Sequence, residues 1–156
     1  MTKLLGSLTL AGLAALAVVC ATGGKPVLAS SARSGQLHIV KDCSAYNGKA
    51  GGTCKIVSSN LAEIPPGSLV YYTQAAEILN PFWLDSNVVL DAGNGNKAAG
   101  RCTVDFTTAT PGVCTFQDGT GQLAGFSARV AVSTSPTPPA NFTWDGRYSF
   151  SEGALN

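Results

Sequence analysis

Apolar and polar residues alternate with a period of two along much of the chain between residues 36 and 150. The clearest case is residues 141–150, where one face carries Phe142, Trp144, Tyr148 and Phe150 and the other carries Thr143, Asp145, Arg147 and Ser149. Similar runs predict further strands over residues 36–42, 53–58, 68–74, 86–91, 101–107, 113–117 and 122–133. Turn sequences such as Asn47-Gly48 and Thr110-Pro111-Gly112 separate the runs. The pattern therefore predicts an all-β domain of eight antiparallel strands, arranged as a sandwich or closed on itself.

The second half of the chain gives the sharpest assignment of faces. In residues 101–107 the apolar face carries Cys102, Val104 and Phe106, and in residues 113–117 it carries Cys114 and Phe116. In residues 122–133 the apolar face carries Ala124, Phe126, Ala128, Val130 and Val132, with Leu123 opposite. We expect these faces to line one shared interior.

Residues 75–85 break the alternation. Their apolar residues crowd around Pro81 without a period of two: Ile78, Leu79, Phe82, Trp83 and Leu84. We interpret the segment as a loop or short helical turn that folds onto the domain. A flap over a cavity mouth is the functional alternative.

The first 32 residues have the features of an export signal. Lys3 is followed by a charge-free apolar run over residues 4–19, and small residues permit cleavage after Ala29 or Ala32. The run is shorter than the roughly 20 residues that a membrane-spanning helix needs, which disfavours a permanent anchor. A lipoprotein acylated at Cys20 is a further alternative. We expect a signal peptide over residues 1–32, a single domain over residues 33–156, and a secreted or periplasmic location.

Charge and composition limit the classes of partner that we expect the protein to bind. Removal of Lys3 and Lys25 from the 10 basic residues leaves 8 against 9 acidic ones, a net charge of −1. Such a chain has no basic stripe for a phosphate backbone, so nucleic acid is not an expected partner. The chain is 45% hydrophobic and 12% charged, which favours a folded domain over disorder.

Cysteine spacing predicts two disulfides. Four cysteines remain after the signal, and each of the pairs Cys43 with Cys54 and Cys102 with Cys114 spans a turn-rich stretch of about a dozen residues. These local pairings are favoured among the three that are formally available. A zinc site is the alternative, but it lacks close cysteine pairs, and His38 is remote from the second pair. No metal or cofactor is expected.

The end of the chain resembles a known family. The run from Asp118 through Gly119-Thr120-Gly121 to Phe126, then an alternating strand, a proline-rich connection and the run from Trp144 to Phe150, is similar to the allene oxide cyclase barrel-like family, which is related to dirigent proteins. The resemblance is closest over residues 100–150 and extends from Leu37. It implies an eight-stranded antiparallel barrel over residues 33–156, homotrimers by analogy with plant members, and an apolar cavity for a lipid-like or phenolic ligand.

The resemblance does not extend to the residues that the plant cyclases use for catalysis. Where those enzymes carry a Glu and an Asn followed by a Pro, this chain has Val40-Lys41-Asp42-Cys43. Asp42 is only a substitute candidate, and a strand-end surface carboxylate is the simpler interpretation. The other titratable candidates, His38, Glu63, Asp91 and Asp105, have no spacing that forces two together.

Three functions follow as hypotheses. The first is a barrel that binds a small apolar molecule through an aromatic lining of Phe106, Phe116, Phe126, Trp144 and Tyr148, unless those rings simply fill the interior. The second is a cyclase or isomerase, which would need a buried carboxylate or tyrosine such as Asp42, Tyr71 or Tyr72. The third is an interaction module with Phe82 and Trp83 as exposed anchors.

Overall fold

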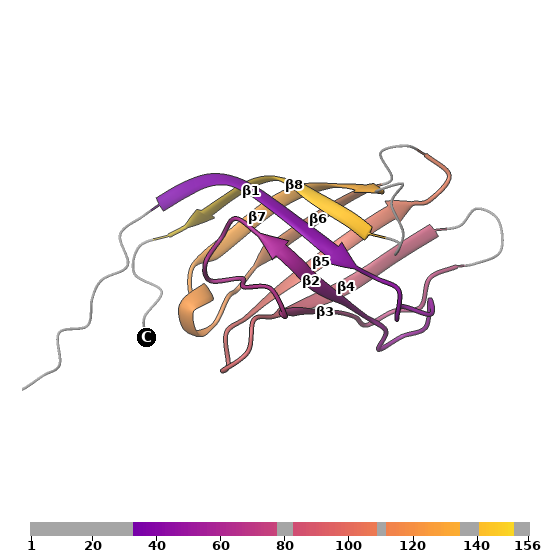
Figure 1. Cartoon of the computed structure of the whole chain (residues 1–156), viewed down its shortest axis with the longest axis horizontal. Helices are drawn as coiled ribbons and strands as arrows, with labels where there is room; N and C mark the ends of the chain where they lie inside the picture. The colour runs from indigo at the N-terminus through magenta and orange to yellow at the C-terminus, as the bar shows by residue number, and fades with distance from the viewer. Residues whose placement is uncertain (1–32, 78–82, 109–111, 135–140, 152–156) are drawn as a thin grey trace, which may run out of the picture.

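The chain folds into a closed eight-stranded antiparallel barrel, which confirms the predicted fold class (Figure 1). The computed structural model describes residues 33–77, 83–108, 112–134 and 141–151. Its elements, in chain order, are β1 (Arg33–Asp42), β2 (Thr53–Ser59), β3 (Leu69–Tyr72), β4 (Trp83–Asp91), β5 (Lys97–Asp105), β6 (Gly112–Gln117), the 3₁₀ turn η1 (Gly121–Leu123), β7 (Phe126–Thr134) and β8 (Asn141–Phe150). Each strand pairs with the next in sequence.

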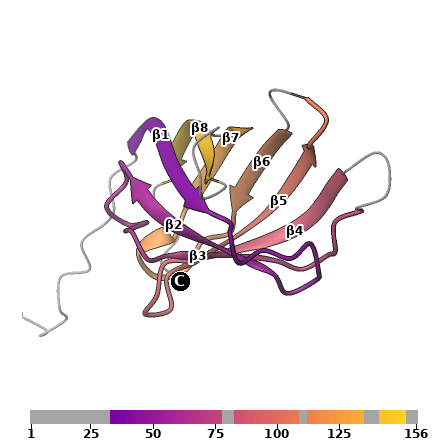
Figure 2. The same ribbon diagram turned by 45° about the vertical axis from the view of Figure 1, so that its right-hand side comes forward.

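The first and last strands close the barrel. β1 and β8 pair along ten residues of each, from Arg33 opposite Phe150 to Asp42 opposite Asn141. Both views show β8 lying beside β1 (Figures 1 and 2). Every strand therefore has a neighbour on each side, although β2 pairs with only Ile39–Asp42 of β1 and β3 with only Val88–Asp91 of β4.

The interior is built from alternate residues, as the period of two predicts. In β8, Trp144 and Phe150 are buried, whereas Asp145 and Arg147 between them are exposed. Aromatic rings pack against each other across the interior, Phe116 against Trp144 with centroids 5.1 Å apart and Phe126 against Phe150 at 5.3 Å. Both pairs are tilted at 54°, and aromatic pairs at these separations add to the stability from burial.

A β-bulge interrupts the pairing of β1 with β2. Val40 lies opposite Ser58, whereas the next residue, Lys41, lies opposite Ile56, so Val57 is the extra residue. Val57 is 43% exposed, while Ile56 beside it is fully buried. The bulge therefore keeps Lys41 and Ile56 together on the interior face, and bulges of this kind recur beside functional sites.

Both predicted disulfides are present. Cys43 is bonded to Cys54, and Cys102 to Cys114, at sequence separations of 11 and 12. Cys102 and Cys114 lie directly opposite each other in the β5–β6 ladder. Since the four sulfurs are bonded in two separate pairs, they are not available as zinc ligands in this state. Such crosslinks persist in compartments more oxidising than the cytosol.

The structure corrects two local predictions. Trp83 and Leu84 belong to β4 rather than to a loop, and they alternate normally, with Leu84 inside and Trp83 outside. The alternation was hidden in the sequence because a serine, Ser86, occupies the next inward position. Its hydroxyl accepts a hydrogen bond from the Gln74 amide and donates one to the Asn87 carbonyl, which satisfies this buried group.

The second correction concerns residues 122–124. Gln122 and Leu123 lie in η1, and β7 begins only at Phe126. Leu123 is fully buried although the strand prediction placed it on the polar face, because a 3₁₀ turn does not follow the period of two.

The expected signal peptide and three of the apolar residues around Pro81, Ile78, Leu79 and Phe82, lie outside the described residues. Among the residues that are described, no helix is long and apolar enough to cross a membrane.

Candidate functional site

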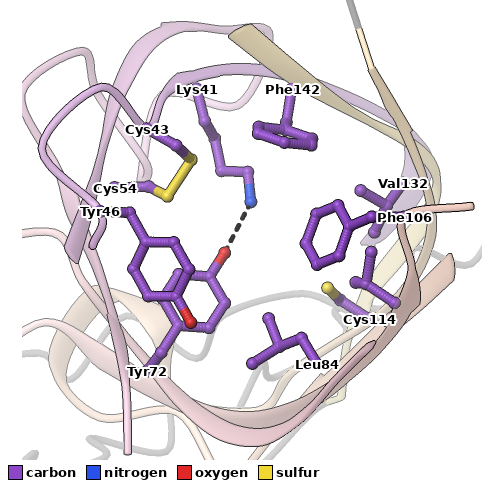
Figure 3. A pocket seen from close by; sticks show the side chains of 11 residues that line it. Lys41, Cys43, Tyr46, Cys54, Tyr72, Leu84, Phe106, Cys114, Val132 and Phe142 are labelled. Atoms are coloured by element: carbon purple, nitrogen blue, oxygen red, sulfur yellow. Dashed lines mark hydrogen bonds between the residues drawn. A yellow bond between two sulfur atoms is a disulfide. The ribbon is translucent and has the colours of Figure 1, made fainter. Parts of the chain in front are cut away.

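A pocket of about 210 Å³ lies inside the barrel, at the end where β1 finishes and β8 begins (Figure 3). Most of its lining is apolar, with side chains from all eight strands, from the loop after β1 and from Phe106, which directly follows β5. The lining residues are Lys41, Cys43, Tyr46, Cys54, Tyr72, Leu84, Val104, Phe106, Cys114, Val132 and Phe142. For comparison, a dry cavity of roughly 150 Å³ binds benzene.

The amine of Lys41 reaches into the middle of this pocket (Figure 3). Lys41 is next to last in β1, on the same face as Leu37 and Ile39, and it is 2% exposed. Its Nζ is hydrogen-bonded to the Tyr72 hydroxyl at 2.9 Å and lies 3.9 Å from the centroid of the Trp144 ring. Alternation along β1 therefore directs a lysine to a position that an apolar residue would ordinarily fill.

Lys41 has no acidic partner among the described residues. The four ion pairs between described residues involve Arg33, His38, Lys97 and Arg101 instead. Burial without a counter-charge disfavours the ammonium form and lowers the pKa of the Lys41 amine from 10.5 to about 7. Neutral amine and ammonium are thus both abundant near neutral pH.

Two tyrosines complete the polar part of the pocket. The ring of Tyr46 packs against that of Tyr72, with centroids 5.0 Å apart. Burial raises the pKa of both phenols above the ordinary value, so both stay protonated near neutral pH. The buried Tyr46 hydroxyl has no hydrogen-bond partner among the described residues. This oxygen is sealed from solvent, and Figure 3 shows it directed away from the Lys41 amine, so it is a buried polar group without a partner rather than a donor exposed to the cavity.

Gly52 makes room for Tyr46. A Cβ atom at Gly52 would lie 2.6 Å from Cδ2 of the Tyr46 ring, closer than real Cβ contacts come. The turn that holds the ring is fixed by a hydrogen bond from the Tyr46 amide to the Cys43 carbonyl at 2.9 Å. The Cys43–Cys54 disulfide and Gly52 together thus place this tyrosine against the pocket.

The five aromatic residues predicted to bind a ligand are not all at this pocket. Phe106 lines it and packs edge-on against Phe142, with centroids 6.0 Å apart. Trp144 lies beneath Lys41 and packs against Phe116 with the two rings tilted. Phe126 and Tyr148 lie toward the other end of the barrel, where both contact Phe150.

The acid–base candidates from the sequence lie outside the pocket. The Asp42 carboxylate accepts a hydrogen bond from the Ser44 amide at 2.9 Å, which holds its pKa below the usual range. His38 pairs with Asp145 at 2.6 Å on the outer surface. The other carboxylates also have partners elsewhere: Glu63 with Arg33, Asp91 with Lys97, and Asp105 with Thr107. No cluster of His, Cys, Asp or Glu suited to a metal occurs within the described ranges.

Of the candidate tyrosines, only Tyr72 lines the pocket, while Tyr71 is half-buried on the opposite face of β3. Lys41 was not among the predicted site residues. A signal for it existed, because Lys41 continues the alternating series of Leu37 and Ile39. A lysine in register with buried apolar residues is costly to the fold, and that cost marks a candidate site.

Comparison with protein-family models, with curated proteins and with solved structures finds no match to this chain.

Proposed function

We propose that the protein binds a small apolar molecule in the pocket between Lys41 and Phe106. The observation that carries this proposal is a cavity of about 210 Å³ with an apolar wall and a few polar groups gathered at one place. Ligand sites in proteins typically combine such a wall with a small number of orienting polar groups. The volume suits a molecule of about one aromatic ring with short substituents.

The polar groups favour a ligand that bears an oxygen. The Lys41 amine lies in the middle of the pocket and offers a hydrogen-bond donor there. The resemblance to allene oxide cyclase barrel-like proteins agrees with this choice, because it implies a lipid-like or phenolic ligand. A phenol of one ring would meet both requirements. Trimer formation, which the same resemblance implies, stays a prediction.

The other two hypotheses have less support. A cyclase or isomerase would need a buried carboxylate or tyrosine: buried Tyr72 lines the pocket, whereas Asp42 and Tyr71 do not, and no carboxylate lines it. An interaction module would present an apolar patch, but among the described residues Val57 is the only large hydrophobic side chain that is exposed. Trp83, one of the two proposed anchors, is half-buried, and Phe82 lies outside the described residues.

Titration of the oxidised protein with p-cresol and with toluene, followed by calorimetry and by NMR, tests the proposal. We expect saturable binding of both probes, with p-cresol the tighter. Val132→Phe places a ring in the pocket and should weaken binding at least tenfold. Val57→Phe, on the outer surface, is the matched control and should leave binding unchanged. Absence of saturable binding of both probes, or equal binding by a folded Val132→Phe variant, would overturn the proposal.

A further inference from the structure

The amine of Lys41 is buried in the pocket without the group that normally accompanies a buried ammonium. Lysine inside proteins is ordinarily paired with a carboxylate. Among the described residues Lys41 has instead the Tyr72 hydroxyl and the uncharged rings of Trp144, Tyr72 and Phe142. The titratable side chains that line the pocket with it are Tyr46 and Tyr72, both uncharged near neutral pH. No negative charge from these neighbours holds the amine in its protonated form.

A neutral amine is a nucleophile, whereas an ammonium is not. An exposed lysine with a pKa of about 10.4 is neutral in roughly one molecule in 2,500 at pH 7. Desolvated lysines with lowered pKa values are the ones that form Schiff bases with carbonyl compounds. For Lys41, with its pKa of about 7, close to half of the molecules carry the neutral form at that pH.

We infer that Lys41 captures an apolar aldehyde or ketone in the pocket as a covalent, reversible Schiff base. The inference rests on the proposed function, since the same pocket must first bind the molecule. It names the ligand class more narrowly, as an apolar molecule with one carbonyl group.

The reaction needs no further reactant. The Nζ lone pair attacks the carbonyl carbon, a C–N bond forms, and the C=O π electrons move to the oxygen. One proton passes from nitrogen to that oxygen, which gives a carbinolamine. The C–O bond then breaks and water leaves with a second proton from the nitrogen, so that aldehyde and amine become imine and water.

The surroundings of Nζ suit each stage. The Tyr72 hydroxyl, 2.9 Å from Nζ, holds the amine in place and lies within reach to pass the proton between nitrogen and oxygen. The face of Trp144, 3.9 Å away, stabilises the positive charge of a protonated imine. Apolar side chains on the other sides, including Leu84 and Val132, limit the water that would hydrolyse the product.

Reductive trapping tests the inference. The oxidised protein is incubated with benzaldehyde and cyanoborohydride at pH 7, and its intact mass and peptide map are recorded. We expect one benzyl group, located on Lys41, to be added at least tenfold faster than to the exposed Lys49, Lys55 or Lys97. Toluene, which fits the pocket but cannot form an imine, should slow the labelling of Lys41 alone.

Two variants separate the pocket from general amine chemistry. Lys41→Met should lose the fast labelling, whereas Lys55→Met, which removes an exposed lysine of β2, should keep it. Should Lys41→Met fail to fold, Val132→Phe gives a second test. It retains the amine and fills the pocket, so the labelling of Lys41 should slow at least tenfold.

The outcomes distinguish the inference from the proposed function. Binding of toluene together with no preferential labelling of Lys41 would overturn the inference and leave the binding function standing. Absence of both binding and labelling would overturn both. Fast labelling of Lys41 that toluene does not slow would also overturn the inference, because the reaction would then not occur in the pocket.

Discussion

The Nζ atom of Lys41 lies 3.9 Å from the centre of the Trp144 ring, inside the barrel. Two opposing effects act on the charge at this position. A cation over an aromatic face gains about 2 kcal/mol when both groups are desolvated. Removal of an ammonium from water costs several kcal/mol even after the protein relaxes. Burial therefore outweighs the attraction of the ring, in agreement with a lowered pKa for Lys41.

Stability should rise with pH because of this lysine. The unfolded chain binds a proton on Lys41 up to an ordinary pKa of 10.5, whereas the folded chain releases it above about 7. Between these values the unfolded state holds more protons, so the free energy of unfolding increases with pH, by about 1.4 kcal/mol per unit. Urea unfolding of the oxidised protein from pH 6 to 9 measures this slope. Below pH 7 both states hold the Lys41 proton, so Lys41 adds little to the slope there.

Lys41→Met isolates this contribution. The stability of the variant minus that of the wild type should be largest near pH 6 and shrink as the pH rises to 9. Measurements should stop there, because the raised pKa of Tyr72 makes stability fall again once unfolded tyrosines lose their protons near pH 10. Parallel pH profiles for variant and wild type would show that the folded protein keeps Lys41 charged.

Gly52→Ala should displace Tyr46. The new methyl group would lie 2.6 Å from the Tyr46 ring, and crowding of this kind typically costs about 1–3 kcal/mol of unfolding free energy. In a Tyr46→Ala background the ring is gone and the same substitution should cost less, although the Lys49 carbonyl remains 3.0 Å away. A double-mutant cycle by urea unfolding gives the coupling energy. If the costs of Gly52→Ala and Tyr46→Ala in unfolding free energy simply add, the Tyr46 ring does not restrict the side chain at position 52.

Each disulfide should stabilise the fold by about 3 kcal/mol, as the chain-entropy model gives for a loop of about 12 residues. Paired replacement by alanine, at Cys43 and Cys54 or at Cys102 and Cys114, should lower the free energy of unfolding by about that amount. Urea titration of the two variants measures the loss. Unchanged stability in either variant would place its crosslink outside the cooperative unit.

Much of the fold was predictable because most of the barrel obeys one rule, the alternation of inward and outward side chains. The prediction gave β8 its observed bounds, Asn141–Phe150, where aromatic and polar residues alternate strongly. The start of β5 was missed. Its first residues, Lys97–Gly100, are mostly alanine and glycine, which are poor strand formers. Pairing with β4, which opposes Lys97 to Asp91 and Gly100 to Val88, holds them in the sheet.

The pocket was less predictable than the fold. Its lining combines residues from distant parts of the chain, such as Lys41 and Val132, and only the closure of the barrel brings them together. The aromatic residues of the sequence indicated which positions face the interior. They did not indicate which end of the barrel contains a cavity. Lys41 follows the alternation of β1, but the pattern alone does not distinguish an inward lysine from a strand that ends one residue earlier.

Closure of the sheet by β1 and β8 sets an order for how the chain assembles. The final strand is synthesised last, so the ladder along β1 stays open until nearly the whole domain exists. Both crosslinks, by contrast, join cysteines only 11 and 12 positions apart, within β-hairpins that need no distant partner. Oxidation can therefore fasten two hairpins early, while the slow long-range pairing that encloses the lysine follows. Until β8 is in place, the open edges of β1 and β7 are where unfinished chains would associate with each other.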